Sequence, residues 1–274
     1  MMKNKFEEIN NASEALLATN FYNFETLKGV LLAAKDQNSS IILQMTKSSI
    51  DYLGLENAVS MAKTGLKYFG VEGWIHLDHG PDIDLVKACL EAGFDSVMYD
   101  GSELPLEQNI ENTKKVVALA DKYGVNVEAE LGYIAKLGQA KDKVDHTTVE
   151  DALRFVQETG VDTLAVAIGT AHGFYKEKPK LDFDRLKEIK EAVKIPLVLH
   201  GGSGVPAESI KKAVKYGICK VNVATEIKNI FMQTLKKLLS ETDEIDLRKV
   251  FPPATNAVKN LVEEKLKIVN DKFI

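Results

Sequence analysis

The sequence predicts an α/β protein folded as a (β/α)8 (TIM) barrel with an extra C-terminal helix, on three observations. Short apolar runs rich in β-branched residues alternate with longer amphipathic stretches along the whole chain. The short runs are almost continuously apolar, as parallel strands are when helices cover the sheet. Eight such units in 274 residues fit a closed barrel better than a doubly wound sheet. We expect one domain over residues 1–274, because no segment has the composition of a linker.

Each element follows from its local pattern. The expected strands, in order, are residues 15–21, 40–46, 73–78, 95–100, 125–132, 162–169, 196–201 and 219–224. Between them, apolar residues recur at helical spacing, and several of these stretches close on a glycine that suits a left-handed C-terminal cap. The clearest helices are residues 24–38, 83–93, 110–124, 149–160 and 208–217. Residues 251–270 predict the additional helix after the last unit.

Composition excludes several classes of partner. The net charge of −5 and the pI near 5.7 give no electrostatic reason to expect nucleic acid. No apolar run approaches the roughly 18 residues that a membrane span needs. The two cysteines, Cys89 and Cys219, are not in C-x-x-C spacing, and the first residues lack the apolar core of a signal peptide. We therefore expect a cytoplasmic protein with two buried thiols that acts on a small molecule.

Histidines gather where three of the expected strands end. His79 follows the third strand, His172 the sixth, and His200 ends the seventh, which accounts for three of the five histidines in the chain. A barrel brings these strand ends around one mouth. A single histidine there is more often satisfied by local hydrogen bonds, but three imidazoles with an open position are the ligand set of a catalytic zinc ion. The pattern predicts a metal site.

The stretch "WIHLDHG" (residues 74–80) carries the remaining chemistry of the third strand. Alternation puts His76 and Asp78 on one face and His79 on the other, so His79 can join the mouth only if the strand ends there, and Gly80-Pro81 is a suitable terminator. His76 is then an interior residue. Asp78, beside a metal ligand, is placed to act as a general acid or base. The alternative role for Asp78 is to orient a ligand histidine by a hydrogen bond.

Glycine-rich turns follow two of the same strands, as "HGFYK" and "HGGSG". Such turns let backbone N–H groups approach an anion, and barrels often bind phosphate in the loops after strands seven and eight. Ser203, Thr225, Lys176 and Lys228 could complete that site, although "GGSG" alone could be only a tight turn. A metal, a phosphate site and an acid together indicate chemistry on a phosphorylated carbonyl compound, with the cation stabilising an enediolate while a carboxylate moves the proton.

With its motifs in this order, the chain resembles the class II zinc-dependent ketose-bisphosphate aldolases. The motifs are "HLDHG", "SVMYDGSELP", "VEAELG", "LAVAIGTAHGFY", "PLVLHGGSG" and "GICKVNVATEIKN". "AVAIGTAHG" with "KVNVATE" is similar to the tagatose-1,6-bisphosphate branch, whereas the fructose-1,6-bisphosphate branch usually has aspartate at the place of Ala224. The resemblance implies reversible cleavage of a ketohexose bisphosphate into dihydroxyacetone phosphate and glyceraldehyde 3-phosphate.

The resemblance also implies roles for single residues. His79, His172 and His200 match the zinc ligands, Glu130 a carboxylate that can meet the metal when it moves, and Asp78 the acid at the C4 oxygen. Asn222 matches the residue that contacts the ketone. The positions that match the dihydroxyacetone phosphate site are Gly173, Lys176, Gly201, Ser203, Thr225 and Lys228. The family also uses a monovalent cation, Na⁺ or K⁺, and its members are usually homodimers or homotetramers.

The chain departs from the family pattern after "ELG". The family usually has a Gly-Gly pair there and then an acidic pair, whose glutamate removes the proton from the hydroxymethyl carbon. This chain reads "YIAKLGQAKDKVDHTTVED", in which Asp142 and Asp145 are the candidate substitutes. Glu103 and Thr19 also differ from the family pattern around the site. Two alternatives therefore stay open: an aldolase for fructose bisphosphate or another phosphorylated sugar, or an impaired relative that binds phosphosugars.

Overall fold

A computed structural model of the chain describes residues 2–12, 14–132, 134, 146–173, 175 and 177–271. Its strands are all parallel and close into a barrel in chain order, with β8 pairing with β1. The strands are β1 (Leu16–Asn20), β2 (Ile41–Met45), β3 (Gly73–Gly80), β4 (Ser96–Tyr99), β5 (Asn126–Leu131), β6 (Thr163–Val166), β7 (Leu197–Leu199) and β8 (Ile218–Val223). The predicted barrel is confirmed, and strand ends differ from the expected ones by at most three residues.

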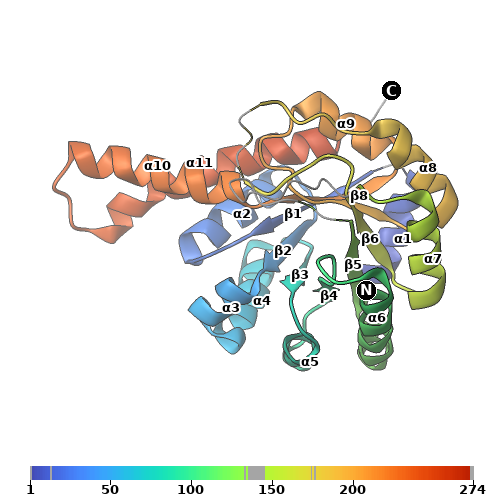
Figure 1. Cartoon of the computed structure of the whole chain (residues 1–274). Coiled ribbons are helices and arrows are strands. Elements are labelled where there is room, and N and C mark those ends of the chain that lie inside the picture. The colour runs from blue at the N-terminus through green and yellow to red at the C-terminus, as the bar shows by residue number, and fades with distance from the viewer. Residues whose placement is uncertain are drawn as a thin grey trace.

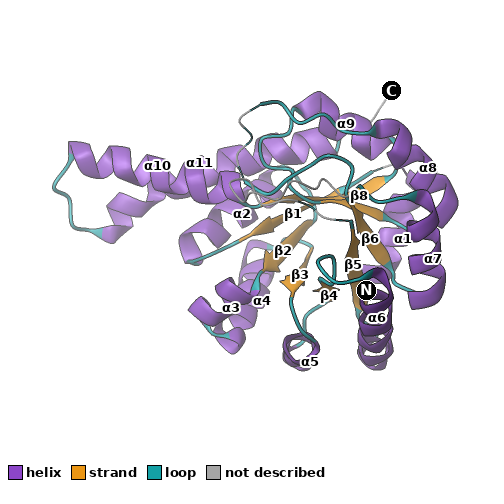
Figure 2. Ribbon diagram, viewed as in Figure 1, coloured by secondary structure: helices purple, strands orange, loops and turns teal. Residues whose placement is uncertain are grey.

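Helices surround the barrel (Figures 1 and 2). They are α1 (Met2–Ala12), α2 (Phe24–Asp36), α3 (Lys47–Leu53), α4 (Leu55–Phe69), α5 (Ile83–Ala92), α6 (Leu106–Ala120), the short η1 (Asp121–Tyr123), α7 (Val149–Thr159), α8 (Phe183–Val193), α9 (Ala207–Lys215), α10 (Thr225–Glu241) and α11 (Leu247–Val269). Glycine caps end α5 and α7 as predicted, at Gly93 (φ 85°) and Gly160 (φ 66°). The predicted C-terminal helix is present as α11, and together with α10 it extends away from the barrel (Figure 1).

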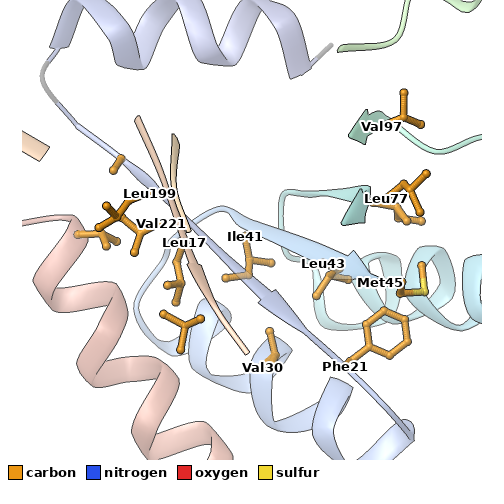
Figure 3. Packing of buried hydrophobic residues seen from close by; sticks show 14 of the residues in the cluster. Leu17, Phe21, Val30, Ile41, Leu43, Met45, Leu77, Val97, Leu199 and Val221 are labelled. Carbon is orange, nitrogen blue, oxygen red and sulfur yellow. The ribbon is translucent and has the colours of Figure 1, made fainter. Parts of the chain in front are cut away.

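The main apolar core lies between the barrel strands and the surrounding helices. Leu17, Ile41, Leu43 and Leu77 point outward from their strands into this layer, and all four are buried (Figure 3). Strand residues of this kind alternate with inward-facing ones, because successive side chains of a strand point to opposite faces. Both faces of each strand are covered, which explains why the strands are so apolar in sequence.

A second, smaller core closes the amino-terminal end of the barrel. Helix α1 buries Met2, Phe6 and Ile9, which lie on one face of the helix, against Ile42 and Trp74 of the barrel floor. This helix was not among those predicted from the sequence. Helix α1 therefore covers the end of the barrel where the strands begin, and the main cavity lies at the other end, where the strands finish.

Candidate active site

The three histidines singled out from the sequence meet at the carboxyl end of the barrel. Ring centroids are 4.9 Å apart for His79 and His172, 4.7 Å for His79 and His200, and 6.0 Å for His172 and His200. One ring nitrogen from each lies within 4.8 Å of the others, an arrangement that can hold a metal ion. A second group with the same property combines His79 with Asp100 and Glu130.

His79 reaches this cluster through an unusual backbone conformation. The prediction that β3 ends at Asp78 was wrong: the strand continues to Gly80, and its pairing with β4 shifts register between Leu77 and Gly80. His79 has a φ of 51°, in the left-handed region that side-chain-bearing residues rarely adopt. This local irregularity, rather than a strand end, turns the imidazole toward the mouth. Strained residues of this kind are enriched at functional sites.

The loops that carry His172 and His200 are fastened to each other. The hydroxyl of Tyr175 accepts a hydrogen bond from the backbone N–H of Ala171 (2.7 Å) and donates one to the carbonyl of Gly201 (2.9 Å). Gly201 has a φ of 67°, and a Cβ added there would lie 2.4 Å from the carbonyl oxygen of Ala171. Only glycine permits this approach, which brings the residues next to both histidines together.

Carboxylates orient two of the three imidazoles. His79 Nδ1 donates to Asp100 Oδ2 at 2.7 Å, and Asp100 in turn accepts from the hydroxyl and N–H of Ser102. His200 lies between Glu130 Oε2, 2.7 Å from its Nδ1, and Glu128 Oε1, 3.0 Å from its Nε2. Pairs of this kind fix the ring orientation of metal-binding histidines.

The donor set of the cluster and the neutral ring of His172 fit a divalent metal. Burial, together with the neighbouring His79 and His200, lowers the pKa of His172 to about 3, so this ring is neutral as a ligand must be. Its Nδ1 is buried without a hydrogen-bond partner among the residues that the structure describes. Burial lowers the pKa of His200, but the two flanking glutamates raise it more, to about 10. Three imidazoles with a carboxylate alongside are ligands that zinc accepts.

Asp78 sits beside this cluster as a buried, ionised carboxylate. Its Oδ2 accepts from Asn20 Nδ2 at 3.1 Å and its Oδ1 accepts from Asn222 Nδ2 at 3.2 Å, while His79 Nε2 lies 3.9 Å from Oδ1. Gln44 Nε2 fixes Asn20 by donating to its Oδ1. Burial raises the pKa of Asp78, but the neighbouring His79, His200, Lys220 and His76 outweigh burial and hold it below its usual value.

One cavity of about 760 Å³ joins His79, His172 and Asp78 to the predicted phosphate residues, while His200 is fully buried and does not line it. The residues singled out from the sequence that line it are Asp78, His79, His172, Gly173, Gly201, Ser203, Asn222, Thr225 and Lys228. Thr225 is the first residue of α10, whose N-cap residue, Ala224, makes no side-chain capping bond. Lys176, Asp142 and Asp145 lie outside the described residues.

Several site residues were missed in the sequence. Asn20 ends β1, Gln44 lies in β2, and Asp100 directly follows β4. Each is a polar side chain at the carboxyl end of an otherwise apolar strand, the same signal that identified Asp78, so the same rule would have found them. Glu103 lines the cavity as expected for a residue that alters the site. Thr19 does not line it, because it alternates with Asn20 and faces the other side of β1.

No helix in the described part of the chain is long and apolar enough to cross a membrane.

The arrangement of fold and site can be compared with known proteins. The model of the family described as class-II fructose-bisphosphate aldolase matches residues 1–272. A curated relative, the fructose-bisphosphate aldolase of Helicobacter pylori (strain ATCC 700392 / 26695), is 40% identical over 281 residues, which cover 92% of each chain.

Solved structures agree. The crystal structure of the YdjI aldolase from Escherichia coli K12 is 30% identical, with a TM-score of 0.87 over 98% of this chain and 96% of that one. The fructose-bisphosphate aldolase of Campylobacter jejuni, at 24% identity, shares the fold with a TM-score of 0.82 over 98% of this chain and 94% of its own. The resemblance noted from the motifs is therefore confirmed. The chain belongs to the class-II fructose-bisphosphate aldolase family and is an aldolase, a carbon–carbon lyase.

Proposed function

We propose that this protein is a zinc-dependent aldolase that reversibly cleaves a ketohexose 1,6-bisphosphate into dihydroxyacetone phosphate and glyceraldehyde 3-phosphate. The observation that carries the proposal is the ionised carboxylate of Asp78 beside three convergent histidines. Asp78 and two of these histidines, His79 and His172, line the same cavity as a set of glycines, hydroxyls and a lysine. An acid–base group, a metal site and an anion site are the parts that this reaction needs.

In this proposal His79, His172 and His200 hold the zinc ion, which supplies a Lewis acid that polarises the ketone carbonyl of the substrate. Glu130, whose Oε2 lies 2.7 Å from His200 Nδ1, is an alternate ligand. Class II aldolases generally depend on zinc, which agrees with this donor set. A Na⁺ or K⁺ ion near the phosphate loops stays a prediction from the family resemblance.

Asp78 moves the proton at the C4 oxygen. In the cleavage direction its ionised carboxylate takes the proton from the C4 hydroxyl, and in condensation it returns that proton to the aldehyde oxygen. Asn20 and Asn222 hold both carboxylate oxygens, so the group is fixed in orientation before substrate arrives. Asn222 Oδ1 is buried without a partner in the described part of the chain, which suits it to accept from a substrate hydroxyl next to the carbonyl carbon.

The dihydroxyacetone phosphate end binds among the cavity residues that follow β6, β7 and β8. Gly173, Gly201, Ser203 and Thr225 offer N–H and hydroxyl donors there, and Lys228 adds a positive charge. The N-terminus of α10 favours a phosphate at the same place, because its first N–H groups lack partners within the helix; one of them, that of Glu226, donates to Ser203 Oγ at 3.4 Å. Lys176 completes the set by sequence position.

We infer tagatose 1,6-bisphosphate as the preferred substrate. Ala224 lines the cavity next to Thr225, so the carboxylate that the fructose-bisphosphate branch usually carries at this place is absent. Fructose 1,6-bisphosphate or another phosphorylated sugar is the alternative. The sequence after Gly132 lacks the glutamate that the family usually has. This difference supports a third possibility, an impaired relative that binds phosphosugars.

The deciding experiment compares cleavage of the two bisphosphates by zinc-loaded and metal-free protein. We expect cleavage only with metal, and a higher kcat/KM for the tagatose epimer. A higher kcat/KM for the fructose epimer would overturn the substrate preference alone. Failure of the zinc-loaded protein to exceed the metal-free control on either sugar would overturn the enzymatic proposal and leave phosphosugar binding.

Three broader expectations accompany this proposal. We propose that the chain is a single domain over residues 1–274, that it works in the cytoplasm, and that it assembles as a homodimer or homotetramer, as the family resemblance implies. Partners other than a phosphosugar are not proposed. The mass of the purified protein by sedimentation tests the assembly directly.

A further inference from the structure

A charged pair lies fully buried inside the barrel, one layer below the histidine cluster. Lys220 of β8, Glu128 of β5 and His76 of β3 each have 0% of their surface exposed. These strands are not neighbours in the barrel, so contacts between them must cross its interior. Barrel interiors are usually filled with branched apolar side chains, and burying an ion pair is costly. The pair therefore calls for a function.

Every donor of the Lys220 ammonium group is used. Nζ donates to Glu128 Oε1 at 3.0 Å, to Glu128 Oε2 at 2.8 Å and to His76 Nε2 at 3.0 Å. Because lysine can only donate, His76 Nε2 must accept, and its Nδ1 proton goes to the hydroxyl of Ser96 at 2.8 Å. Burial, and the charge on Lys220, hold the pKa of His76 near 3, consistent with a neutral ring. Lys220 is thus fixed in one position.

Glu128 connects this pair to the site. Its Oε1 accepts from Lys220 and also from His200 Nε2, at 3.0 Å in both cases. Both carboxylate oxygens are therefore anchored by lysine while one of them holds the imidazole. Because Glu128 holds Nε2, only Nδ1 of His200 is available to a metal in the cluster. This nitrogen lies 2.7 Å from Glu130 Oε2.

We propose that Lys220 and Glu128 are a positioning pair, in which Lys220 holds Glu128 in place and Glu128 in turn orients His200 as a metal ligand. This inference rests on the proposed metal site. His79 has a simpler arrangement, since the other partner of its carboxylate, Asp100, among the described residues is Ser102 and not a lysine. A lysine therefore stands behind the carboxylate partner of His200 and a serine behind that of His79, and double-mutant cycles can measure the two arrangements separately.

The test measures zinc affinity of the full-length protein by competition with a chromophoric chelator. The variants are Lys220→Met, Glu128→Gln and the double variant. Removing an outer partner of a ligand histidine typically weakens metal binding about 10- to 100-fold, which we expect for Glu128→Gln. Lys220→Met should weaken binding about 10-fold on its own but less than about two-fold in the Glu128→Gln background, because Lys220 acts only through Glu128.

Equal losses from Lys220→Met in both backgrounds would overturn the inference, as would unchanged zinc affinity in Glu128→Gln. Lys220→Met leaves the buried carboxylate of Glu128 without its lysine, with only His200 as a hydrogen-bond partner among the described side chains, and this loss can prevent folding. The neutral double variant avoids this, and its zinc affinity should match that of Glu128→Gln; a further large loss would contradict the proposal.

Two controls separate stability from positioning. Lys265→Met removes another largely buried lysine, paired with Glu226 at 2.9 Å, and should lower stability without changing zinc affinity. In an Asp100→Asn background, Lys220→Met should keep its full effect, because Asp100 orients a different histidine. Wild-type protein that binds no zinc, or His200→Ala protein that binds it as tightly, would overturn the metal site itself, and this inference with it.

Discussion

Asp78 is held by two amides, so its orientation does not depend on a charged partner. Asp78→Asn keeps the shape and can still form hydrogen bonds, but an amide cannot move the proton at C4. We expect kcat to fall by about 10²- to 10⁴-fold. Zinc affinity should change little, because Asp78 is not in the group of metal-ligating side chains. Steady-state kinetics and a zinc titration measure the two effects.

Asp95 offers a matched control for this variant. It precedes β4 at the closed end of the barrel, where its Oδ2 accepts from the N–H of Ile75 at 2.9 Å. Asp95→Asn can keep that bond and should retain wild-type turnover. If Asp78→Asn were as active as Asp95→Asn, Asp78 would be no more than an orienting residue, the alternative that the sequence left open.

Gly201 is the second residue on which the site depends. Gly201→Ala places a Cβ 2.4 Å from the carbonyl of Ala171 and forces alanine to a φ of 67°, so the loops bearing His172 and His200 must separate. The left-handed backbone alone costs about 1–2 kcal/mol, and we expect a larger total loss in the free energy of unfolding, with weakened zinc binding. Urea unfolding and chelator competition measure both.

Gly160→Ala isolates the backbone cost. Gly160 has a φ of 66°, and nothing lies within 4 Å of an added Cβ. This control should show the strain of the left-handed conformation without a clash and without any change at the site. Equal destabilisation by the two substitutions would mean that the approach of the two loops is not constrained by Gly201.

At the scale of elements, α1 closes the barrel floor without touching the active site. Phe6 is 2% exposed in the small core between α1 and the strands. Phe6→Ala should lower the free energy of unfolding by about 3–5 kcal/mol, through lost burial and the cavity left behind. Zinc affinity of the folded protein should stay at the wild-type value, because the histidines lie at the opposite end.

Glu7, exposed on the same helix, is the matched control. Glu7→Ala should change stability by no more than about 0.5 kcal/mol. Loss of zinc binding in folded Phe6→Ala protein would contradict the claim that α1 stabilises the fold without affecting the active site. It would mean that α1 supports the site through the barrel interior.

The elements that sequence predicted best are those with strong periodicity. All eight strands were recognisable because helices cover one face and the packed barrel interior the other, which leaves long apolar runs. Helix α1 was missed because only three of its residues are buried, so its apolar stripe is short. The left-handed backbone of His79 could not be predicted either, since it arises from a register shift between β3 and β4 that no local pattern records.

At the scale of the whole molecule, the barrel topology explains which residues of the site could be predicted from the sequence. Residues at the carboxyl ends of the strands converge in any parallel barrel. The proximity of His79, His172 and His200 could therefore be predicted from the sequence. Contacts across the barrel, such as Lys220 with Glu128, depend on how far each strand is staggered, and the sequence does not encode that in any local spacing. In the sequence, Lys220 and Glu128 are only polar residues within two apolar strands. Their pairing becomes visible only in the closed barrel.

The most direct measurement is exchange of the C3 proton of dihydroxyacetone phosphate in D₂O, followed by NMR with zinc-loaded protein. It tests whether this site activates the bound ketone, in a chain whose sequence lacks the usual loop glutamate. We predict stereospecific exchange that is abolished by chelation and restored by zinc. Phosphate-dependent binding with no exchange would contradict an active aldolase and identify a protein that holds the phosphosugar without activating it.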